Sequence, residues 1–231
     1  LKGEDLLGAY QAALSVLSQN FAAFPYDART ALYLAHVLSL APPGGPADRG
    51  LLAEALTRAI EGSPKRSQPW YVLVNLSLDQ ANEHAPGSPE RVAGYAAAKD
   101  LLARYIVLVP TLAQPHFVLA ELAHGTGDDA TAAAEAALGV EYYTRDLQTA
   151  RRASRFFLAT EEWNTARFFL GEVVELEPND LAALYDLAKA SYLSGDPAAA
   201  AGIVATLRTK NPEILATDPA FLSAIADYES R

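Results

Sequence analysis

Five arginines gather in the second half of a chain that is acidic overall. The 231 residues carry a net charge of −10, and the arginines are Arg145, Arg151, Arg152, Arg155 and Arg167. Arg151 and Arg155 are one helical turn apart, so on a helix their guanidinium groups can converge on one anion. Two interpretations stay open. The arginines form a clamp for an acidic side chain or a C-terminal carboxylate, or they form internal salt bridges to Asp146, Glu161, Glu162 and Asp186.

Other side chains that could carry catalysis or bind a metal are few. Glu121 and His124 would share one face of a helix, but a di-metal site in a helical bundle needs two such motifs, and no second copy exists. The chain has no cysteine, which excludes disulfides, thiolate metal sites and a cysteine nucleophile. Phosphate-binding glycine loops and the motifs of zinc proteases and serine hydrolases are also missing. We therefore expect a protein that is not an enzyme, with no catalytic residues, no metal and no cofactor.

The elements that must position these side chains repeat along the sequence. Alanine recurs every 34 residues, at Ala98, Ala132, Ala166 and Ala200. Twelve residues after each alanine stand Pro110, Thr144, Pro178 and Pro212. A fixed period of this length predicts an array in which each copy packs against its neighbours. Small residues at such positions let two helices approach closely.

Each copy resembles the tetratricopeptide repeat, a helix–turn–helix unit of about 34 residues. The first helices contain the motifs that start each copy: Trp70-x2-Leu73-Val74, His116-x2-Leu119-Ala120, Ala150-x2-Ala153-Ser154-x2-Phe157 and Leu184-x2-Leu187-Ala188-x2-Ser191. The second helices carry the pairs Ala98/Leu102, Ala132/Ala136, Ala166/Leu170 and Ala200/Val204. Gly127-Asp128 and Gly195-Asp196 stand where this family turns between its helices, and Glu161-Glu162-Trp163 replaces them in the middle copy.

The sequence therefore predicts an all-α fold, a right-handed α-solenoid of about twelve helices with a C-terminal capping helix. We expect one solenoid domain over 1–231. Its predicted parts are a half repeat or N-terminal cap (1–25), a divergent repeat (26–66), a repeat with an insertion near 83–89 (67–110), three further repeats (111–144, 145–178 and 179–212) and the capping helix (213–231). The predicted helices are 4–20, one that begins at Asp27 and ends at the Pro42–Pro46 loop, 48–61, 67–82, 90–108, 113–125, 128–143, 145–159, 162–176, 179–194, 197–210 and one that begins at Asp218 and Pro219.

The resemblance also implies a binding surface. In this family the first helices line a concave groove that binds peptides or extended protein segments. Positions i, i+3, i+7 and i+10 of each first helix share that face. Aromatic, amide and charged residues at these positions are the candidate peptide-binding residues: Tyr71, Asn75, Phe117, Glu121, Arg151, Arg155, Tyr185, Lys189 and Tyr192.

The expected function is a non-catalytic protein–protein interaction scaffold whose partner is a peptide or protein with an acidic segment. Two alternatives stay open: a self-assembling structural module, or the regulatory or docking part of a larger chain, because 1–25 has the pattern of half a repeat. The acidic composition argues against nucleic-acid binding. No apolar run reaches the roughly 18 residues of a membrane-spanning helix. The compartment stays open between the cytoplasm and an extracytoplasmic space reached after removal of an upstream segment.

Overall fold

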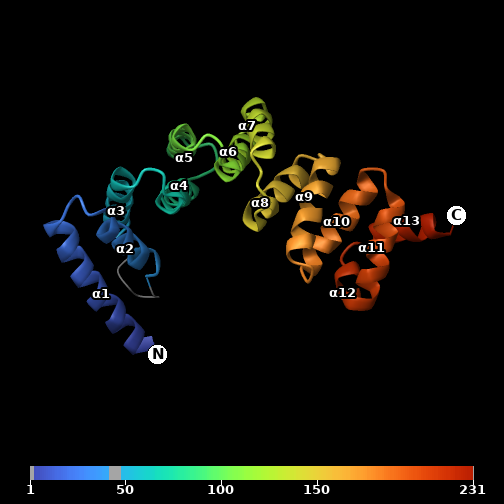
Figure 1. The fold of residues 1–231 in the computed structure, drawn as a ribbon, viewed down its shortest axis with the longest axis horizontal. Helices are drawn as coiled ribbons and strands as arrows, with labels where there is room; N and C mark the ends of the chain where they lie inside the picture. Colours follow the sequence, from blue (N-terminus) through green and yellow to red (C-terminus); the bar gives the residue numbers. More distant parts are fainter. Residues whose placement is uncertain (1–2, 42–47, 231) are drawn as a thin grey trace. The chain divides into compact units, whose positions relative to one another are not determined.

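The structure, a computed structural model, describes residues 3–41 and 48–230, and within these ranges it is built from thirteen helices and no strand. Figure 1 shows the helices following one another through short turns. The predicted fold class, an all-α solenoid of helix–turn–helix repeats, is confirmed. The helices form two compact units, unit 1 (Leu1–Thr111) and unit 2 (Leu112–Arg231). That the whole chain forms a single solenoid domain stays a prediction.

Unit 1 contains five helices: α1 (Gly3–Ala23), α2 (Ala28–Ser39), α3 (Arg49–Gly62), α4 (Ser67–Asn82) and α5 (Pro89–Leu108). α2 pairs with α3 and α4 pairs with α5 as helical hairpins, and α1 packs on α2 (Figure 1). Asp27 caps α2 as predicted, because its carboxylate accepts a hydrogen bond from the backbone N–H of Arg29 at 3.0 Å. The loop predicted at 42–46 lies outside the described residues.

The hairpins of unit 1 are held by buried apolar side chains. Trp70 of α4 stacks on Tyr105 of α5 with ring centroids 5.4 Å apart. The indole Nε1 of Trp70 donates a hydrogen bond to the Pro64 carbonyl at 2.8 Å. Trp70 therefore joins its own hairpin to the segment that follows α3. The core between α1, α2 and α3 consists of Phe21, Ala31, Leu34, Ala35, Leu38, Ala55, Leu56 and Ala59.

Unit 2 contains eight helices among its described residues: α6 (Ala113–Gly125), α7 (Asp129–Glu141), α8 (Leu147–Ala159), α9 (Trp163–Leu176), α10 (Leu181–Leu193), α11 (Pro197–Lys210), α12 (Pro212–Leu215) and α13 (Pro219–Glu229). The pairs α6–α7, α8–α9 and α10–α11 are hairpins (Figure 1). α13 is the predicted last helix, with Asp218 as its N-cap. α12 is one turn that the repeat pattern does not predict, because it follows the last full repeat.

Two first helices begin two residues later than predicted, and the reason is their capping. α8 begins at Leu147 rather than 145, and α10 begins at Leu181 rather than 179. Asp146 accepts a hydrogen bond from the N–H of Thr149 at 2.9 Å, and Asp180 accepts one from the N–H of Ala183 at 3.0 Å. These side chains satisfy N–H groups that the first turn of a helix leaves unpaired, so each aspartate marks the helix start.

The turns inside the three hairpins of unit 2 have one geometry. Gly127, Glu161 and Gly195 are spaced 34 residues apart, and all three have left-handed backbones, with φ of 77°, 59° and 91°. The residue after each one donates a backbone hydrogen bond at 2.9 Å to a carbonyl five residues earlier, a pattern that closes the first helix. The predicted turn positions are therefore confirmed, and Glu161 adopts a conformation in which the other two copies use glycine.

The alanines that define the period lie where two helices meet. Ala98, Ala132, Ala166 and Ala200 are each at most 3% exposed. Beside the alanines of unit 2, the rings of Phe157 and Phe169 stack with centroids 5.8 Å apart, and Phe117 meets Phe169 edge to face at 5.7 Å. The small residues allow close approach and the aromatic rings fill the remaining space, as the sequence pattern predicts.

The extra residues of the copy at 67–110 are mostly helical. α4 has 16 residues and α5 has 20, whereas α6 and α7 have 13 each. Ser88 caps α5 by accepting a hydrogen bond from the N–H of Arg91 at 3.2 Å, and the Tyr95 hydroxyl donates to Asn82 at 3.0 Å across the hairpin. The insertion predicted near 83–89 thus lengthens both helices and the turn that joins them.

Candidate functional site

The candidate site is a pocket of about 200 Å³ on α6 and α8 of unit 2. Polar or charged residues alone line it, and we call it the arginine pocket: Gln114, Glu121, Gln148, Arg151, Arg152 and Arg155. The first two come from α6 and the other four from α8. Walls of this kind suit a charged or hydrogen-bonding group and offer no surface to an apolar anchor.

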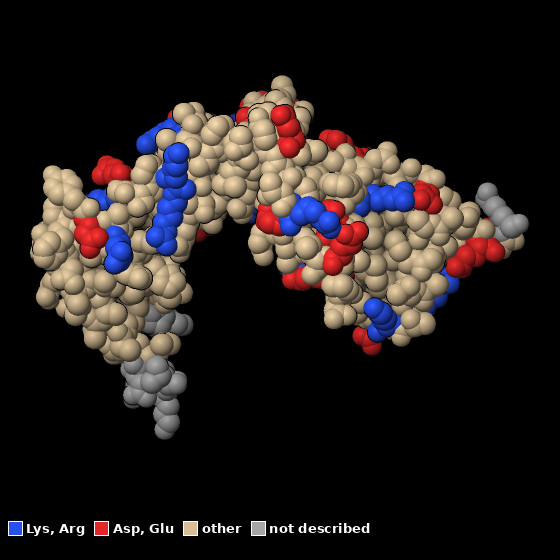
Figure 2. Space-filling model, viewed as in Figure 1, with Lys and Arg blue, Asp and Glu red and all other residues tan. Residues whose placement is uncertain are grey.

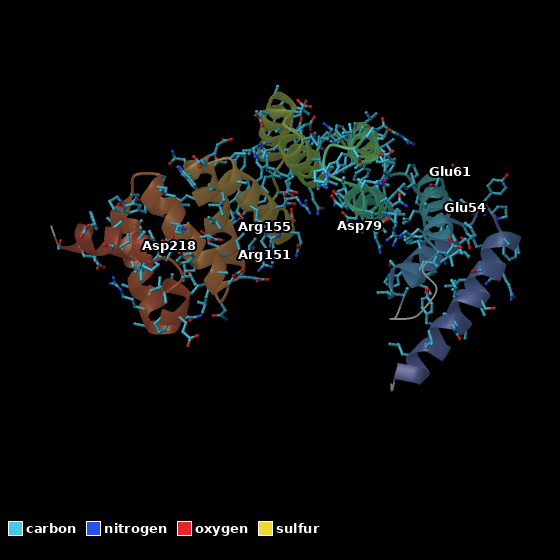
Figure 3. The ribbon with its side chains drawn as sticks, turned by 180° about the vertical axis from the view of Figure 1, so that it is seen from behind. Glu54, Glu61, Asp79, Arg151, Arg155 and Asp218 are labelled. Atoms are coloured by element: carbon cyan, nitrogen blue, oxygen red, sulfur yellow. The ribbon has the colours of Figure 1, made fainter. Side chains whose placement is uncertain are left out.

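α8 presents these side chains because its two faces differ. Ala150, Ala153 and Phe157 are almost fully buried in the core that α8 shares with α6 and α9. Arg151 and Arg155 stand on the other face, one turn apart, and Figure 3 shows them on the same stretch of α8. An amphipathic helix that buries its small and aromatic residues leaves its cations at the surface.

Arg151 is tied to the start of the next first helix. Its Nη2 lies 2.7 Å from Oδ2 of Asp180 and also donates to Glu177. Asp180 is the N-cap of α10, so one carboxylate caps a helix and compensates a cation. The positive charge of Arg151 is therefore already balanced by two carboxylates of the chain.

Arg152 is compensated from the opposite direction, by Glu121 of α6. Burial raises the pKa of Glu121, while the neighbouring guanidinium of Arg152, and more weakly that of Arg155, act to lower it. Burial is the larger influence, so this carboxylate is harder to ionise than an exposed one. It is nevertheless hydrogen-bonded to a guanidinium, which makes Glu121 an internal occupant of the arginine pocket.

Arg155 differs from its two neighbours. Its side chain is exposed, and within the described part of unit 2 it forms no hydrogen bond or ion pair. It acts on Glu121 only at a distance, as a minor influence on that pKa. Arg155 is therefore the guanidinium of the arginine pocket that is available to a group from outside.

Internal salt bridges bind most of the arginines, but not with the predicted partners. Arg145 pairs with Glu172 at 2.7 Å and with Glu175 at 2.6 Å, and Arg167 pairs with Asp196 at 2.8 Å. Figure 2 shows basic and acidic atoms beside one another over α8–α11. The partners are far away in the sequence because each arginine reaches a neighbouring hairpin or the next helix start. These bridges involve none of the predicted carboxylates Asp146, Glu161, Glu162 and Asp186.

Phe117 is a correction to the predicted groove. Its side chain has no exposed surface and packs edge to face against both Phe157 and Phe169, and an added Cβ on Gly139 would lie 2.9 Å from its ring. α6 is apolar around most of its circumference, so the spacing rule that selects one exposed face does not hold for it. Phe117 belongs to the core and not to the exposed face.

The last helix covers the predicted groove residues of α10. Phe221 of α13 meets Tyr185 and Tyr192 edge to face, at 6.0 and 5.9 Å between centroids. Lys189 Nζ lies 2.7 Å from Oδ2 of Asp218, whose place at the start of α13 is labelled in Figure 3. This hydrogen bond is the main reason why the pKa of Lys189 is raised and that of Asp218 is lowered. Tyr185, Lys189 and Tyr192 therefore contact the last helix and are partly covered by it, and their part in a binding groove stays a prediction.

The two remaining candidates lie in unit 1. Tyr71 of α4 is half-buried and meets Tyr105 edge to face at 6.0 Å. Asn75, one turn later, is exposed. The structure thus brings together Glu121, Arg151 and Arg155 of the predicted set. Sequence reasoning missed Gln114, Gln148 and Arg152 as site residues, although the first two stand on the predicted face and the third belongs to the arginine group.

The two side chains of the Glu121–His124 motif bond to different partners. Nδ1 of His124 lies 3.1 Å from Oδ1 of Asp129, while Glu121 bonds to Arg152. Among the described residues, no group of three or more histidine, aspartate or glutamate side chains could hold a metal ion. No helix in residues 3–41 and 48–230 has both the length and the apolar character needed to cross a membrane.

Comparison with known proteins connects this architecture to one family. Residues 157–228 match the family model for the tetratricopeptide repeat. No curated protein matches the chain by sequence. A thermophilic TPR protein of Thermus thermophilus has a similar structure, with a TM-score of 0.56 at 18% identity over 80% of this chain and 92% of that one.

Two further solved structures are similar over most of their length. The pilF protein of Pseudomonas aeruginosa gives a TM-score of 0.58 at 14% identity, over 89% of this chain and 86% of that one. YrrB, described as a TPR protein with an unusual peptide-binding site, gives 0.56 at 13% identity, over 87% of this chain and 95% of that one. At such identities the likeness shows a shared fold.

Proposed function

The chain is a tetratricopeptide repeat protein, and from this premise we propose that it is a non-catalytic scaffold that binds an extended, acidic segment of a partner protein in the arginine pocket of unit 2. Proteins of this family present their first helices to peptide ligands, and the pocket is formed by two first helices, α6 and α8. The observation that carries the proposal is Arg155, an exposed guanidinium without an internal partner beside arginines that have one.

The pocket offers complementary groups for such a segment. Arg155 can pair with a carboxylate through two parallel N–H donors. The side-chain amides of Gln114 and Gln148 can donate to and accept from an extended backbone, which has one donor and one acceptor per residue. The salt bridges of Arg151 and Arg152 fix the walls, so little conformational entropy is lost in the scaffold upon binding.

Charge reversal at Arg155 tests this proposal. Immobilised wild type is compared with Arg155→Glu and with Lys210→Glu, a matched reversal at an exposed residue in the last turn of α11. Proteins retained from an extract of the native host are identified by mass spectrometry. We expect a partner that wild type and Lys210→Glu retain and that Arg155→Glu loses. Retention of the same partner by all three proteins would contradict binding at Arg155.

A photo-crosslinking residue localises the contact directly. Gln148 is exposed at the rim of the arginine pocket, whereas Thr206 is exposed on α11. A benzoylphenylalanine at position 148 should crosslink to the partner, and the same residue at position 206 should not. Crosslinks from position 206 alone would move the binding surface away from α6 and α8.

On the predicted face of unit 1, Asn75 is the exposed residue and Tyr71 is half-buried. We propose both as contacts for a protein segment on this face of unit 1, considered separately from the arginine pocket. An Asn75→Ala variant should weaken partner retention only modestly, because an exposed neutral hydrogen bond contributes about 0.5–1.5 kcal/mol.

Self-association is a second candidate function, favoured by the apolar surface of α1 and α2. Phe24, Tyr26 and Tyr33 are 61%, 97% and 56% exposed, and Val16 on α1 is 58% exposed. Exposed apolar surface of this kind favours contact with another protein surface, here a second copy of the chain. Sedimentation equilibrium of wild type should show a concentration-dependent dimer that Tyr33→Ser weakens. A monomer at every concentration would exclude this function.

A further inference from the structure

At two helix starts of unit 2, those of α10 and α13, the N-cap aspartate is neutralised by a first helix that comes before it. Asp180, the N-cap of α10, pairs with Arg151, which stands five residues after the previous first-helix N-cap, Asp146. Asp218, the N-cap of α13, accepts a hydrogen bond from Tyr185, which stands five residues after Asp180, and it also pairs with Lys189. At each of these junctions an aspartate therefore receives donors from the helix before it.

The corresponding junction of unit 1 has the opposite charge. The N-cap of α4 is Arg66, and its side chain makes no capping hydrogen bond. The residue five positions after the N-cap Asp27 is Leu32, so the place held by Arg151 in unit 2 is apolar here. A cation thus stands where unit 2 has a carboxylate, and no acidic residue of the preceding helix pairs with it.

A pocket of about 370 Å³ lies at this junction. Arg29 and Arg66 belong to its lining, and we call it the Arg29–Arg66 pocket: Asp27, Ala28, Arg29, Leu32, Ala59, Ser63 and Arg66. Both arginines are exposed, and within residues 3–41 and 48–230 neither guanidinium forms an ion pair or a side-chain hydrogen bond. Two cations therefore border one cavity without internal compensation of the kind seen in unit 2.

The carboxylate of this pocket is already engaged elsewhere. Asp27 accepts hydrogen bonds from the hydroxyl of Thr30 at 2.6 Å and from the N–H of Arg29 at 3.0 Å. The first of these is the main reason why the pKa of Asp27 is lowered. Its single negative charge leaves the pair of arginines with an excess of one positive charge, and its oxygens are occupied by the first turn of α2.

We propose that the Arg29–Arg66 pocket binds the carboxylate of an acidic side chain from a partner protein, which gives these arginines the kind of counter-charge that Asp180 gives Arg151 in unit 2. The two guanidinium groups supply paired N–H donors, and the hydroxyl of Ser63 adds one more. Leu32 and Ala59 provide an apolar wall for the methylene groups of a glutamate. An excess of one positive charge matches one carboxylate and not a doubly charged phosphate.

This site lies wholly in unit 1 and does not depend on the arginine pocket. A labelled hexaglutamate peptide is titrated against the Arg155→Glu variant, in which the arginine pocket is blocked, and the anisotropy of the label is measured. A hexaglutamine peptide reports uncharged binding. We expect hexaglutamate to bind and hexaglutamine not to bind. Arg29→Gln with Arg66→Gln should weaken the binding of hexaglutamate about tenfold, which corresponds to roughly 1.4 kcal/mol.

A matched pair of substitutions controls for net charge. Arg49→Gln with Arg91→Gln removes the same charge from the same unit, at residues outside the pocket. This control should keep the affinity of the Arg155→Glu protein. An equal loss in both double variants, or no loss in Arg29→Gln with Arg66→Gln, would overturn the proposal.

Backbone amide shifts test the site even where a double variant does not fold. In the Arg155→Glu protein, hexaglutamate should shift the amide signals of Ala28, Arg29 and Ser63, which border the pocket. Shifts confined to other residues would overturn the proposal just as clearly.

Discussion

Units 1 and 2 share one repeat pattern but treat charge differently at the starts of their first helices. In unit 2, Arg151 and Lys189 meet the capping carboxylates Asp180 and Asp218. In unit 1, the N-cap Arg66 borders a pocket with Arg29 and has no such partner. The comparison teaches that the repeat fixes where side chains meet, while the residue type decides whether that place holds an internal salt bridge or arginines without one.

The two units can also be compared through their apolar cores, where substitutions should have the largest effect on stability. Leu102 and Leu170 occupy the same repeat position, and both are at most 2% exposed. Replacing either leucine with alanine should cost about 3 kcal/mol of unfolding free energy, because a cavity adds to the lost apolar burial.

Each unit carries its own reporter for that experiment, since the two tryptophans are Trp70 in unit 1 and Trp163 in unit 2. Urea unfolding is followed by tryptophan fluorescence. In Trp163→Phe, where Trp70 remains, Leu102→Ala should lower the unfolding midpoint of unit 1. In Trp70→Phe, where Trp163 remains, Leu170→Ala should lower the midpoint of unit 2. If both tryptophans report equal shifts for both substitutions, the units unfold as one, and their separation has no thermodynamic meaning.

Glycine-to-alanine substitutions at close helix contacts should have the next largest effect on stability. In unit 1, a Cβ added to Gly94 would lie 2.6 Å from the methyl group of Ala81. In unit 2, a Cβ added to Gly139 would lie 2.9 Å from the ring of Phe117. Gly94→Ala and Gly139→Ala should each destabilise the protein by about 2 kcal/mol, since neither neighbour can move freely. Thermal unfolding measured by circular dichroism gives the comparison.

Gly171 of α9 is the matched control, because a Cβ there meets nothing within 4 Å. Gly171→Ala should stabilise the protein by roughly 0.5–1 kcal/mol through helix propensity. A Gly139→Ala variant that behaves like Gly171→Ala would show that Phe117 repacks without cost.

Substitutions in the hairpin turns should have the third largest effect on stability. Gly87 in unit 1 and Gly127 in unit 2 have φ of 79° and 77°, whereas Glu161 reaches 59° with a side chain. Glu161→Gly should stabilise unit 2 by about 1 kcal/mol, and Gly87→Ala and Gly127→Ala should cost about as much, because a Cβ is unfavourable in this conformation. Urea midpoints measure all three, and a destabilised Glu161→Gly would mean that the glutamate side chain stabilises the turn.

Much of the fold follows from the sequence because the period constrains it. The boundaries of α4, α6 and α11 are those predicted, since α6 and α11 follow the repeat and α4 ends where the insertion begins. The candidate site follows only in part. Phe117 is buried because several helices surround α6, and Lys189 is paired with Asp218 because of where α13 packs. Both are tertiary facts that local spacing does not contain.

Tyrosine ionisation gives the smallest expected difference between the units. Tyr143 of unit 2 has its pKa raised to about 12, first by burial and then by the carboxylate of Glu172. Burial also raises the pKa of Tyr105 in unit 1, where a hydrogen bond with Ser67 opposes the shift. Both folded units therefore favour the protonated hydroxyl, and unit 2 has in addition a nearby negative charge.

The sign of the effect follows from proton binding. Unfolded tyrosine loses its proton near pH 10, so between about pH 10 and 12 the folded chain binds more protons than the unfolded one. The stabilisation from Tyr143 is present below pH 10 and is lost as the pH rises through about 12. Solvent screening limits its size, because this side chain is only partly buried.

The measurement compares urea midpoints at about pH 8 and about pH 11 for wild type, Tyr143→Phe and Tyr105→Phe. Wild type should lose stability between these values, and Tyr143→Phe should lose less, because it has no proton to release in the unfolded state. Tyr105→Phe should recover a smaller part of that loss. If Tyr105→Phe flattens the profile more than Tyr143→Phe, burial in unit 1 outweighs the combined effect of burial and Glu172 in unit 2.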